Sequence, residues 1–558
     1  METLGFGDIL GPVMVGPSSS HTAGALRIAR MARRLVGSQP AKVTFTLYMS
    51  FAHTGRGHGT DKALIAGMLD FNTDDLRIRD SYELAREAGM DVEVIFDTQT
   101  ETSHPNTVDI EAIDAAGRAL RLRGVSVGGG AVSIRNIDGI DVDITGEHTS
   151  LVTRQTDAKG VLAHIAQCVA DAGVNIATTR MFREHKGQIA YTVMEIDAPV
   201  HKDVCEAILA HPDIHEVRVI PAMVESSQKS GAEGNAIAAG TGEAAEASAH
   251  EYASYADAEQ LFQAYDFTCG AELLALCARE KASIGTCYRM REVGLSAVQR
   301  EISMRNAARE LDEYCTYVLD VMRESAIGPV ENPQRSMGGL IGGEAQAVAR
   351  AEKQLVDNLT QRAMTYAMAV LETNACMGRI VAAPTAGSAG VVPSVLLALT
   401  DKYGYSREQL VEALHCAAAV GTIIARNASV SGAQGGCQAE VGAACGMAAA
   451  AEVQLAGGTP AQCLDAAANA LMCLMGLVCD PVRGLVEVPC QKRNASAAAT
   501  ALVCAQMALA GIENLVPFDE AVAALDAVGK SLPFELRESA LGGIAACKSA
   551  CRLVQPTR

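Results

Sequence analysis

The sequence predicts a multidomain protein with an α+β N-terminal domain, a small β-α-β-β-α-β domain and a mainly α-helical C-terminal domain. The chain has 558 residues, which is more than one hydrophobic core usually supports. Strand-like and helix-like patterns are mixed up to about residue 222, whereas the apolar periodicity is predominantly helical from Asp257 onward. The predicted boundaries are 1–146, 147–222, a linker at 223–256, and 257–558.

In the N-terminal domain, the stretch from Ala41 to Ser50 alternates apolar and polar residues as a half-buried strand does. Val92 to Phe96 is a shorter strand of the same kind, and the apolar spacing of Asp61 to Asp70 predicts a helix between them. The glycines at 128–130 predict a turn before another strand at 131–135. This mixture predicts an α+β domain.

The second domain has a regular element order. Strands and helices are predicted in the order strand, helix, strand, strand, helix, strand, at 150–153, 160–172, 175–182, 188–196, 202–210 and 214–221. This order is the ferredoxin-like supersecondary pattern. The stretch that follows, 224–253, is rich in Ser, Gly, Ala and Glu and predicts a flexible linker.

The C-terminal part is rich in Ala, Leu and Met at helical spacing, with breaks at Gly and Pro. Aromatic residues are 4% of the chain and Trp is absent, so the core must be built from closely packed aliphatic residues and Ala. Helical segments are predicted at 272–324, 344–375, 406–426, 440–456, 460–476, 495–511 and 518–529.

Charge and composition exclude several classes of partner. The 46 Lys and Arg against 65 Asp and Glu give a net charge of -19, which disfavours nucleic acid and anionic membranes. Glu2 and Asp8 stand where a secretory signal would be basic and apolar, and no run of 18 apolar residues occurs, so a cytoplasmic protein is expected. An odd total of 17 cysteines favours thiols and metal ligands over disulfides.

Three of the cysteines lie in predicted loops beside Gly or Pro: Cys437, Cys479 and Cys490. Thiolates hold iron–sulfur clusters, so these residues are candidate ligands. Their spacing matches no short Cys-x-x-Cys motif, and buried free thiols or a Cys473–Cys479 redox pair are alternatives. Other cysteines sit inside helical patterns and are expected to be small core residues: Cys168, Cys277, Cys463 and Cys504.

Six motifs resemble those of the iron–sulfur-dependent bacterial L-serine dehydratases. Three resemble the α-domain motifs: Ala383-Pro-Thr-Ala-Gly-Ser-Ala-Gly390, Gly435-Gly-Cys-Gln-Ala-Glu-Val-Gly442, and Cys479-Asp-Pro-Val together with Val488-Pro-Cys490 and Arg493-Asn494. Three resemble the β-domain motifs: Gly16-Pro-Ser-Ser-Ser-His-Thr22, Thr54-Gly-Arg-Gly-His-Gly-Thr-Asp61 and His104-Pro-Asn-Thr107. The motifs follow the family's β-then-α order and cover most of the chain.

The resemblance implies a 4Fe-4S cluster held by Cys437, Cys479 and Cys490, with the fourth iron left for substrate. An open iron is a Lewis acid that can bind the carboxylate and polarise the hydroxyl of L-serine. His58 is the candidate base for the Cα proton, although a loop histidine is by itself more often a surface or capping residue. The expected reaction gives pyruvate and ammonia, and the expected assembly is a homodimer.

The same resemblance implies a substrate-binding set from both segments. Ser18 to Thr22 precedes a helical run, where Ser and Thr could simply cap the helix, yet a helix N-terminus also holds anions. The predicted substrate-binding residues are Ser18, Ser19, Ser20, His21, Thr22, Asn106, Thr385 and Ser388.

The middle domain resembles an ACT domain in its element order and in two motifs, Asp157-Ala-Lys-Gly-Val-Leu162 and Gly173-Val-Asn-Ile176. This implies an amino-acid effector, with a purely structural or dimerising role as the alternative. Some single-chain members of the resembling family end in a cysteine that reaches the cluster, whereas this chain continues beyond Cys551 to Arg558. Whether Cys547 or Cys551 reaches the fourth iron is therefore open.

Two other functions are considered. Pyridoxal-phosphate-dependent β-elimination would need a Schiff-base lysine, for which Lys353, Lys402 and Lys492 lack a convincing context. An amino-acid sensor would have no use for the cysteine and histidine motifs together. Within the resembling family, L-threonine or L-cysteine as substrate is the alternative to L-serine.

Overall fold

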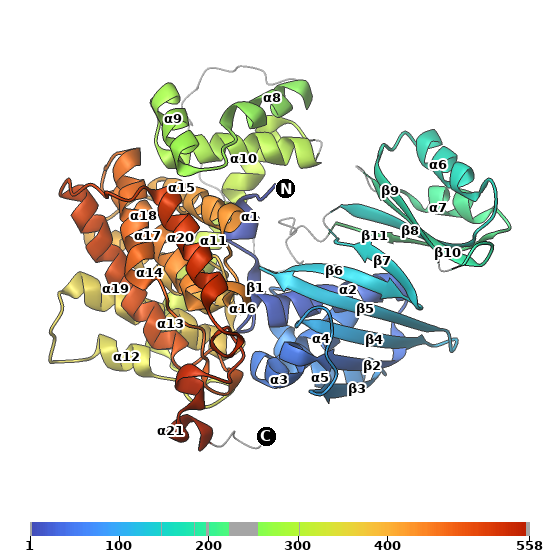
Figure 1. The fold of residues 1–558 in the computed structure, drawn as a ribbon, viewed down its shortest axis with the longest axis horizontal. Helices are drawn as coiled ribbons and strands as arrows, with labels where there is room; N and C mark the ends of the chain where they lie inside the picture. The colour runs from blue at the N-terminus through green and yellow to red at the C-terminus, as the bar shows by residue number, and fades with distance from the viewer. Residues whose placement is uncertain are drawn as a thin grey trace, which may run out of the picture.

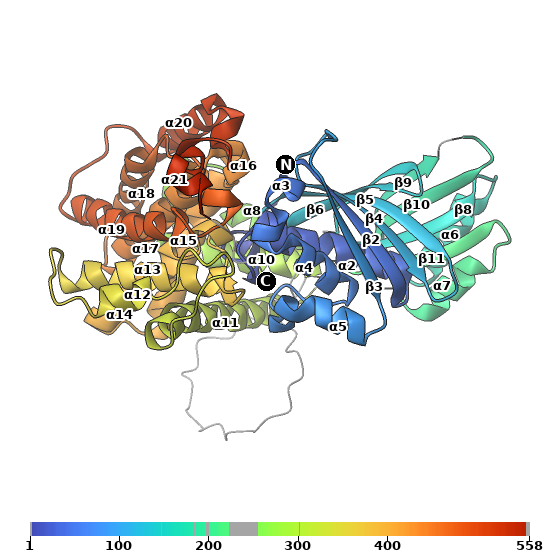
Figure 2. The ribbon, with the colours of Figure 1, turned by 90° about the horizontal axis from the view of Figure 1, so that it is seen from below.

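The computed structural model describes residues 3–146, 148–183, 185–196, 200–222, 255–300 and 302–553. The α+β domain lies between the large helical domain and the small sheet domain (Figures 1 and 2). The predicted linker falls outside the described residues except for its last two positions. These begin helix α8 (Tyr255–Tyr265), so the helical domain starts before the predicted residue 257.

The α+β domain is built on a six-stranded sheet of order β3-β2-β4-β5-β6-β7. Strands β2 and β3 are parallel and the other neighbours are antiparallel. Helices α2 and α4 pack together on one face, with Ile28, Phe45 and Leu64 fully buried. The elements are α2 (Ala25–Val36), β2 (Pro40–Tyr48), α3 (Met49–His58), α4 (Thr60–Met68), α5 (Ser81–Glu87), β3 (Asp91–Asp97), β4 (Thr107–Asp114), β5 (Ala119–Gly128), β6 (Ala131–Ile137) and β7 (Ile140–Ile144).

The small domain has the predicted β-α-β-β-α-β order and an antiparallel sheet of order β11-β8-β10-β9. Because side chains alternate across a strand, Leu151 and Met194 face the helices, whereas Val152 and Val193 join the core of the α+β domain. The elements are β8 (Thr149–Thr156), α6 (Val161–Asp171), β9 (Ile176–Arg183), β10 (Ile189–Ile196), α7 (Lys202–Leu209) and β11 (Ile214–Ile220). The ferredoxin-like pattern is confirmed.

The helical domain follows most of the prediction, but α8 and the one-turn helices α16 and α21 lie outside the predicted segments. The segment 272–324 is divided among α9, α10 and α11, and 344–375 is divided between α12 and α13. Helix α14 was not predicted, because Val391 to Leu399 are all buried and leave little polar periodicity. The helices are α9 (Gly270–Glu280), α10 (Ile284–Arg300), α11 (Met304–Glu331), α12 (Glu344–Ala349), α13 (Asn358–Ala375), α14 (Val391–Tyr403), α15 (Arg407–Asn427), α16 (Gly432–Gly435), α17 (Ala443–Leu455), α18 (Pro460–Leu474), α19 (Cys490–Leu509), α20 (Phe518–Ser531) and α21 (Lys548–Cys551).

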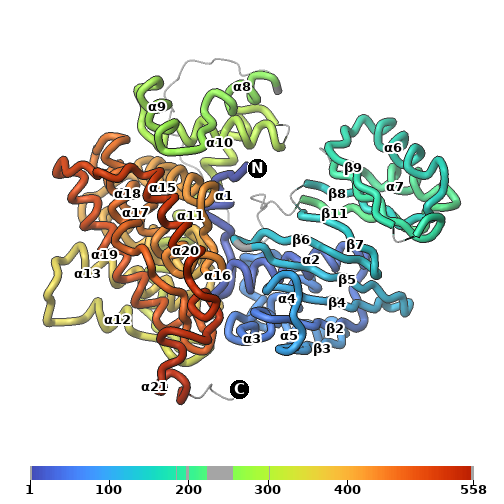
Figure 3. The backbone as a smooth tube through the Cα atoms, viewed as in Figure 1, coloured from blue at the N-terminus to red at the C-terminus, as the bar shows by residue number. Residues whose placement is uncertain are grey.

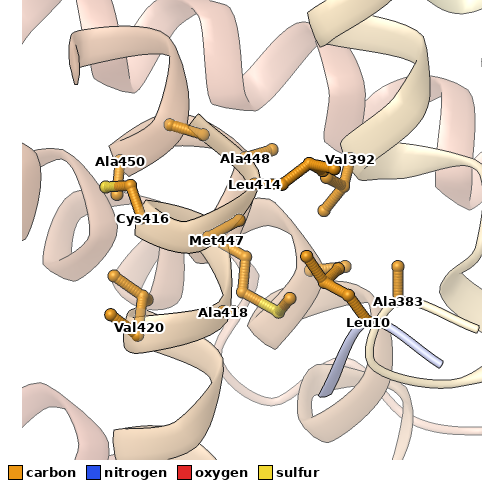
Figure 4. Close-up of a cluster of buried hydrophobic side chains, with 14 of the residues drawn as sticks. Leu10, Ala383, Val392, Leu414, Cys416, Ala418, Val420, Met447, Ala448 and Ala450 are labelled. Atoms are coloured by element: carbon orange, nitrogen blue, oxygen red, sulfur yellow. The ribbon is translucent and has the colours of Figure 1, made fainter. Parts of the chain in front are cut away.

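Alanine allows the central helices to approach closely. Figure 4 shows Ala418 of α15 and Ala448 of α17 among larger residues such as Leu414 and Met447, all fully buried. Among the described residues, α15 alone has the length and apolar composition of a membrane span, and 72% of its apolar window is buried. A core helix of a helical bundle meets the same criteria.

The start of the chain belongs to the helical domain rather than to the predicted 1–146 unit. Helix α1 (Phe6–Ile9) is part of the helical core, and the Phe6 ring lies 5.1 Å from that of His415. Strand β1 (Val13–Val15) pairs with β12 (Arg379–Val381). The backbone trace in Figure 3 shows α1, in blue, beside α11 and α15 of the helical domain. This two-stranded sheet ties the α+β domain to the helical domain a few residues before both the 16–22 and 383–390 motifs.

Candidate active site

One cavity is lined by residues from both domains. Ser18, Ser19, Ser20 and Gly129 come from the α+β domain. The helical domain contributes Thr385, Gly387, Cys437, Glu440, Cys479, Asp480, Cys490, Arg493 and Glu538 among others. The structure therefore brings together seven of the predicted site residues: Ser18, Ser19, Ser20, Thr385 and the three cysteines.

The three cysteines reach the cavity from different local structures. Cys437 precedes a π-helical turn (Gln438–Gly442), Cys479 lies in the segment before Pro481, and Cys490 is the first residue of α19. All three are buried. Burial raises the pKa of the Cys437 thiol to about 12, and raises those of Cys479 and Cys490 well above the usual range. With these raised pKa values the three thiols are protonated at physiological pH.

The donor set fits an iron–sulfur cluster. Three buried thiols on one cavity are the ligand chemistry that such clusters require. In the described part of the chain, no group of three or more His, Cys, Asp and Glu side chains is arranged to hold a single metal ion. These observations agree, because the thiolates of a cluster bind different irons and stand farther apart than the ligands of one ion.

Glu440 is a cavity residue that the sequence analysis did not assign. Thr385 Oγ1 donates to Glu440 Oε1 at 2.8 Å, and Cys479 Sγ lies 3.8 Å from Glu440 Oε2. Burial raises the pKa of the Glu440 carboxyl to about 7. A Cβ at Gly432 would lie 2.5 Å from Glu440 Oε2, so a larger residue there would displace the Glu440 carboxylate. Glu440 lies within the 435–442 motif, which was the available sequence signal.

An ion pair joins the two later cysteine segments. Arg493 Nη1 lies 2.7 Å from Asp480 Oδ1, and the side chain of Asp480 is 2% exposed. The guanidinium also donates to the carbonyl of Val478 at 2.8 Å. Arg493 therefore places a positive charge beside the thiols and lowers the otherwise raised pKa of Cys437.

The Ser18–Thr22 segment both caps a helix and faces the cavity. Ser18 Oγ accepts from the His21 amide at 3.1 Å and caps the π-helical turn Ser19–Gly24, which continues into α2. His21 is buried behind the serines, with Nδ1 2.8 Å from Ser20 Oγ and Nε2 2.9 Å from Ser50 Oγ. The serines are thus cavity residues, whereas His21 holds them in position.

His58 is buried in the layer behind the cavity wall. Its ring centroid is 4.5 Å from that of His21, and Thr22 Oγ1 donates to its backbone carbonyl at 2.8 Å. Nδ1 lies 3.2 Å from Thr54 Oγ1, and Nε2 has no hydrogen-bond partner among the described residues. Burial lowers the pKa of His58 to about 4, so the imidazole is neutral at physiological pH.

Besides His21, the predicted substrate-binding residues Thr22, Asn106 and Ser388 do not line the cavity. Asn106 is buried; its Nδ2 donates to the carbonyl of Ser126 at 3.4 Å, and its Oδ1 has no partner in the described structure. Ser388 stands behind Thr385, 3.2 Å from Thr385 Oγ1, and donates to the carbonyl of Ala383. Asn106 and Ser388 both support the backbone around the cavity.

The C-terminal segment docks beside the site without placing a thiol in it. The amide of Ile544 donates to Asp480 Oδ2 at 2.6 Å. Cys547 and Cys551 are exposed and are not among the cavity-lining residues. The three lysines considered for a Schiff base, Lys353, Lys402 and Lys492, are exposed and do not line it either.

The fold and the cavity define a multidomain enzyme whose thiol-lined site is shared between an α+β domain and a helical domain. A family model described as serine dehydratase alpha chain matches residues 270–545, and one described as serine dehydratase beta chain matches residues 8–91. The chain belongs to the serine dehydratase family, with the β segment preceding the α segment in one polypeptide.

Relatives match the two segments either separately or in one chain. The "Probable L-serine dehydratase, alpha chain" of Bacillus subtilis (strain 168) is 53% identical over 214 residues, which are 38% of this chain and 71% of that protein. The "Probable L-serine dehydratase, beta chain" of the same organism is 38% identical over 213 residues, which are 38% of this chain and 96% of that protein. The "L-serine dehydratase" of Streptomyces coelicolor (strain ATCC BAA-471 / A3(2) / M145) is 28% identical over 546 residues, covering 95% of this chain and 96% of that protein.

Proposed function

We propose that this chain is an L-serine ammonia-lyase that converts L-serine to pyruvate and ammonia with a 4Fe-4S cluster. The observation that carries the proposal is the convergence of Cys437, Cys479 and Cys490 on one cavity. Ser18 to Ser20 complete that cavity from the other domain. The family and the names of the relatives supply the reaction and its substrate.

The cysteines would hold the cluster, which when bound supplies an open iron as a Lewis acid toward the substrate carboxylate and hydroxyl. The chain's own contribution to binding is the start of the helical turn at Ser19. The first amide N–H groups of such a turn have no partner within the helix and can bind an anion, and the helix dipole favours a carboxylate. Thr385 supplies a hydroxyl from the helical domain.

Elimination also requires a base for the Cα proton, and we assign this role to His58. Its imidazole is neutral, and its Nε2 is buried without a partner among the described residues, so the nitrogen is free to accept a proton. His58 is one layer behind the cavity wall, and catalytic contacts often tighten only when substrate is bound. Thr22 and Thr54 fix the backbone and ring of His58 for that step.

The positions of the lysines weigh against pyridoxal phosphate. A Schiff-base lysine must reach the reacting carbon, whereas Lys353, Lys402 and Lys492 are exposed and away from the cavity. L-Threonine and L-cysteine carry the same carboxylate and amine as L-serine. Relative kcat/KM values for the three amino acids decide which one is the substrate.

Three further assignments belong to the proposal. The ferredoxin-like domain is an ACT-type regulatory domain, the assembly is a homodimer, and the enzyme is cytoplasmic. The sheet order β11-β8-β10-β9 supports the ACT-type domain. The apolar part of α15 is mostly buried within the helical domain, which is compatible with a cytoplasmic enzyme.

Anaerobic purification followed by iron and acid-labile sulfide analysis tests the cofactor, and pyruvate formation from L-serine tests the activity. We expect both in the same preparation, with activity and cluster absorption lost together in air. A preparation made under strict exclusion of oxygen that has neither cluster nor activity would refute the proposal. A borohydride-reducible aldimine would instead indicate pyridoxal phosphate.

A further inference from the structure

The proposed substrate carries a positive charge that the cluster and the serines leave without a partner. The open iron and the helical turn at Ser19 account for the carboxylate and hydroxyl of L-serine. The α-ammonium group needs hydrogen-bond acceptors, and a carboxylate makes the stronger, charge-assisted kind of hydrogen bond with it. Three carboxylates line the active-site cavity: Glu440, Asp480 and Glu538.

Asp480 already has a resident counterion. Arg493 Nη1 lies 2.7 Å from Asp480 Oδ1, and the amide of Ile544 donates to Asp480 Oδ2 at 2.6 Å. The side chain is only 2% exposed, so it offers little surface to a ligand. The carboxylates left to bind a cationic group are those of Glu440 and Glu538.

Glu440 is held in place without a counterion. Thr385 Oγ1 donates to Glu440 Oε1 at 2.8 Å, and Glu440 Oε2 lies 3.8 Å from the thiol of Cys479. Two glycines make room for the carboxylate, because a Cβ at Gly387 would lie 3.1 Å from Oε1 and a Cβ at Gly432 would lie 2.5 Å from Oε2. A carboxylate has about four acceptor positions, so Glu440 keeps acceptor capacity for a ligand.

Glu538 brings a second carboxylate to the same wall. Its amide donates to the carbonyl of Cys479 at 2.9 Å, and its carboxylate accepts from the amide of Ala433. Burial and the neighbouring charge of Glu440 raise the pKa of the Glu538 carboxyl to about 8. Among the described residues, no Lys, Arg or His forms an ion pair with either glutamate. Since like charges repel in a buried place, a cationic group of a ligand is favoured beside them.

We propose that Glu440 and Glu538 bind the α-ammonium group of the substrate and thereby make the cavity specific for amino acids over the corresponding 2-hydroxy acids. This assignment rests on the proposed function, because it takes L-serine as the ligand. A site built to bind a polar group rejects an analogue that lacks it, since the buried acceptors are then left unpaired. The two charged ends of the substrate are thus bound by different domains.

L-Alanine and L-lactate are the matched ligands for the test, because lactate has a hydroxyl in place of the ammonium group and neither carries the β-hydroxyl that is eliminated. Hydrogen–deuterium exchange of the anaerobically purified full chain at 17–22 and 431–442 measures occupancy of this cavity without turnover. Its position also separates this cavity from any amino acid bound elsewhere. We expect L-alanine to protect both segments at a concentration about tenfold or more below that of L-lactate.

Glu440→Gln keeps an acceptor for Thr385 and removes the negative charge. It should raise the L-alanine concentration for half-maximal protection by about tenfold or more, the usual effect of losing a charged hydrogen bond, and leave that of L-lactate unchanged. KM for L-serine should rise by a similar factor. Glu440→Asp keeps the charge and should keep the preference for L-alanine. Glu535→Gln is the control, because Glu535 is exposed and outside the cavity.

The iron and acid-labile sulfide content of each variant shows whether the cluster is intact, since Glu440 contacts Cys479. If Glu440→Gln has lost the cluster, Glu538→Gln gives the same comparison. A selective weakening of L-alanine in that variant supports the assignment.

Equal protection by L-alanine and L-lactate in the parent chain, or by neither, would overturn the inference. An unchanged L-alanine response in the glutamine variants would overturn it as well, and an equal weakening of both ligands would show that the glutamates are only structural. A chain that forms no pyruvate from L-serine, yet loses its preference for L-alanine in Glu440→Gln, would refute the proposed function and support this inference.

Discussion

Arg493 Nη1 lies 2.7 Å from Asp480 Oδ1, and this ion pair connects the residue after Cys479 to the first turn of the helix that begins at Cys490. The other carboxylate oxygen, Asp480 Oδ2, accepts a hydrogen bond from the amide of Ile544 at 2.6 Å. A single buried aspartate thus holds two of the cysteine segments and the C-terminal segment together.

Asp480→Asn should lower the free energy of unfolding by about 3 kcal/mol, since it leaves a largely buried guanidinium without its counterion. Urea denaturation measures this change. Asp526→Asn removes an exposed pair with Lys530 and should cost about 0.5 kcal/mol or less. Equal small losses in both variants would show that the Asp480 pair does not stabilise the site.

Thr22→Val removes the 2.8 Å hydrogen bond to the His58 carbonyl while keeping the shape of the side chain. Thr22 Oγ1 also accepts a hydrogen bond from the Ser18 amide at 3.3 Å, so the variant loses two buried hydrogen bonds. The loss should cost about 2 kcal/mol of stability, and kcat for L-serine should fall because the support of His58 is lost. Thr22→Ser keeps the donor and should restore kcat. If the valine and serine variants have the same kcat, Thr22 does not position His58.

His58→Asn should lower kcat by about a hundredfold or more, the usual contribution of a general base, and leave the iron content unchanged. His53→Asn, at an exposed position of the same helix α3, is the control and should retain the parent rate. A near-normal rate in His58→Asn would mean that another group takes the Cα proton.

The pH dependence of stability tests the buried state of His415. Burial lowers its pKa to about 3, whereas an unfolded histidine titrates near 6.5. Between these values the unfolded state binds the additional proton, so stability is complete above about pH 6.5 and is lost as the pH falls toward 3. His415→Phe should reduce the loss between about pH 6.5 and 5 by about 2 kcal/mol. Identical losses in both proteins would show that His415 is accessible to protons in the fold.

Local patterns predicted the ferredoxin-like domain closely. The short, largely apolar runs at 150–153 and 188–196 predicted strands that the structure places at β8 and β10. One face of each strand is buried against helices and the other against the α+β domain, so neither run needs a polar face. The same reasoning missed α14, since its first nine residues are all buried and the helix shows no polar face. Helix α1 is only one turn long and gave no periodic signal.

The candidate site was predicted through its motifs rather than its geometry. The motif residues Ser18 to Ser20, Thr385 and the three cysteines do line one cavity. Their separation along the chain carries no information on which of them touch. The roles of Glu440 and Asp480, and the supporting positions of Asn106 and Ser388, depend on tertiary contacts and could be found only in the structure.

The iron and acid-labile sulfide content of anaerobically purified Cys479→Ala tests the central claim most directly. Cys463→Ala is the matched control, because Cys463 is equally buried but lies in α18, outside the cavity. The account predicts that Cys479→Ala loses the cluster and pyruvate formation, while Cys463→Ala retains both. A Cys479→Ala protein with the full iron and sulfide content of the parent chain would contradict it.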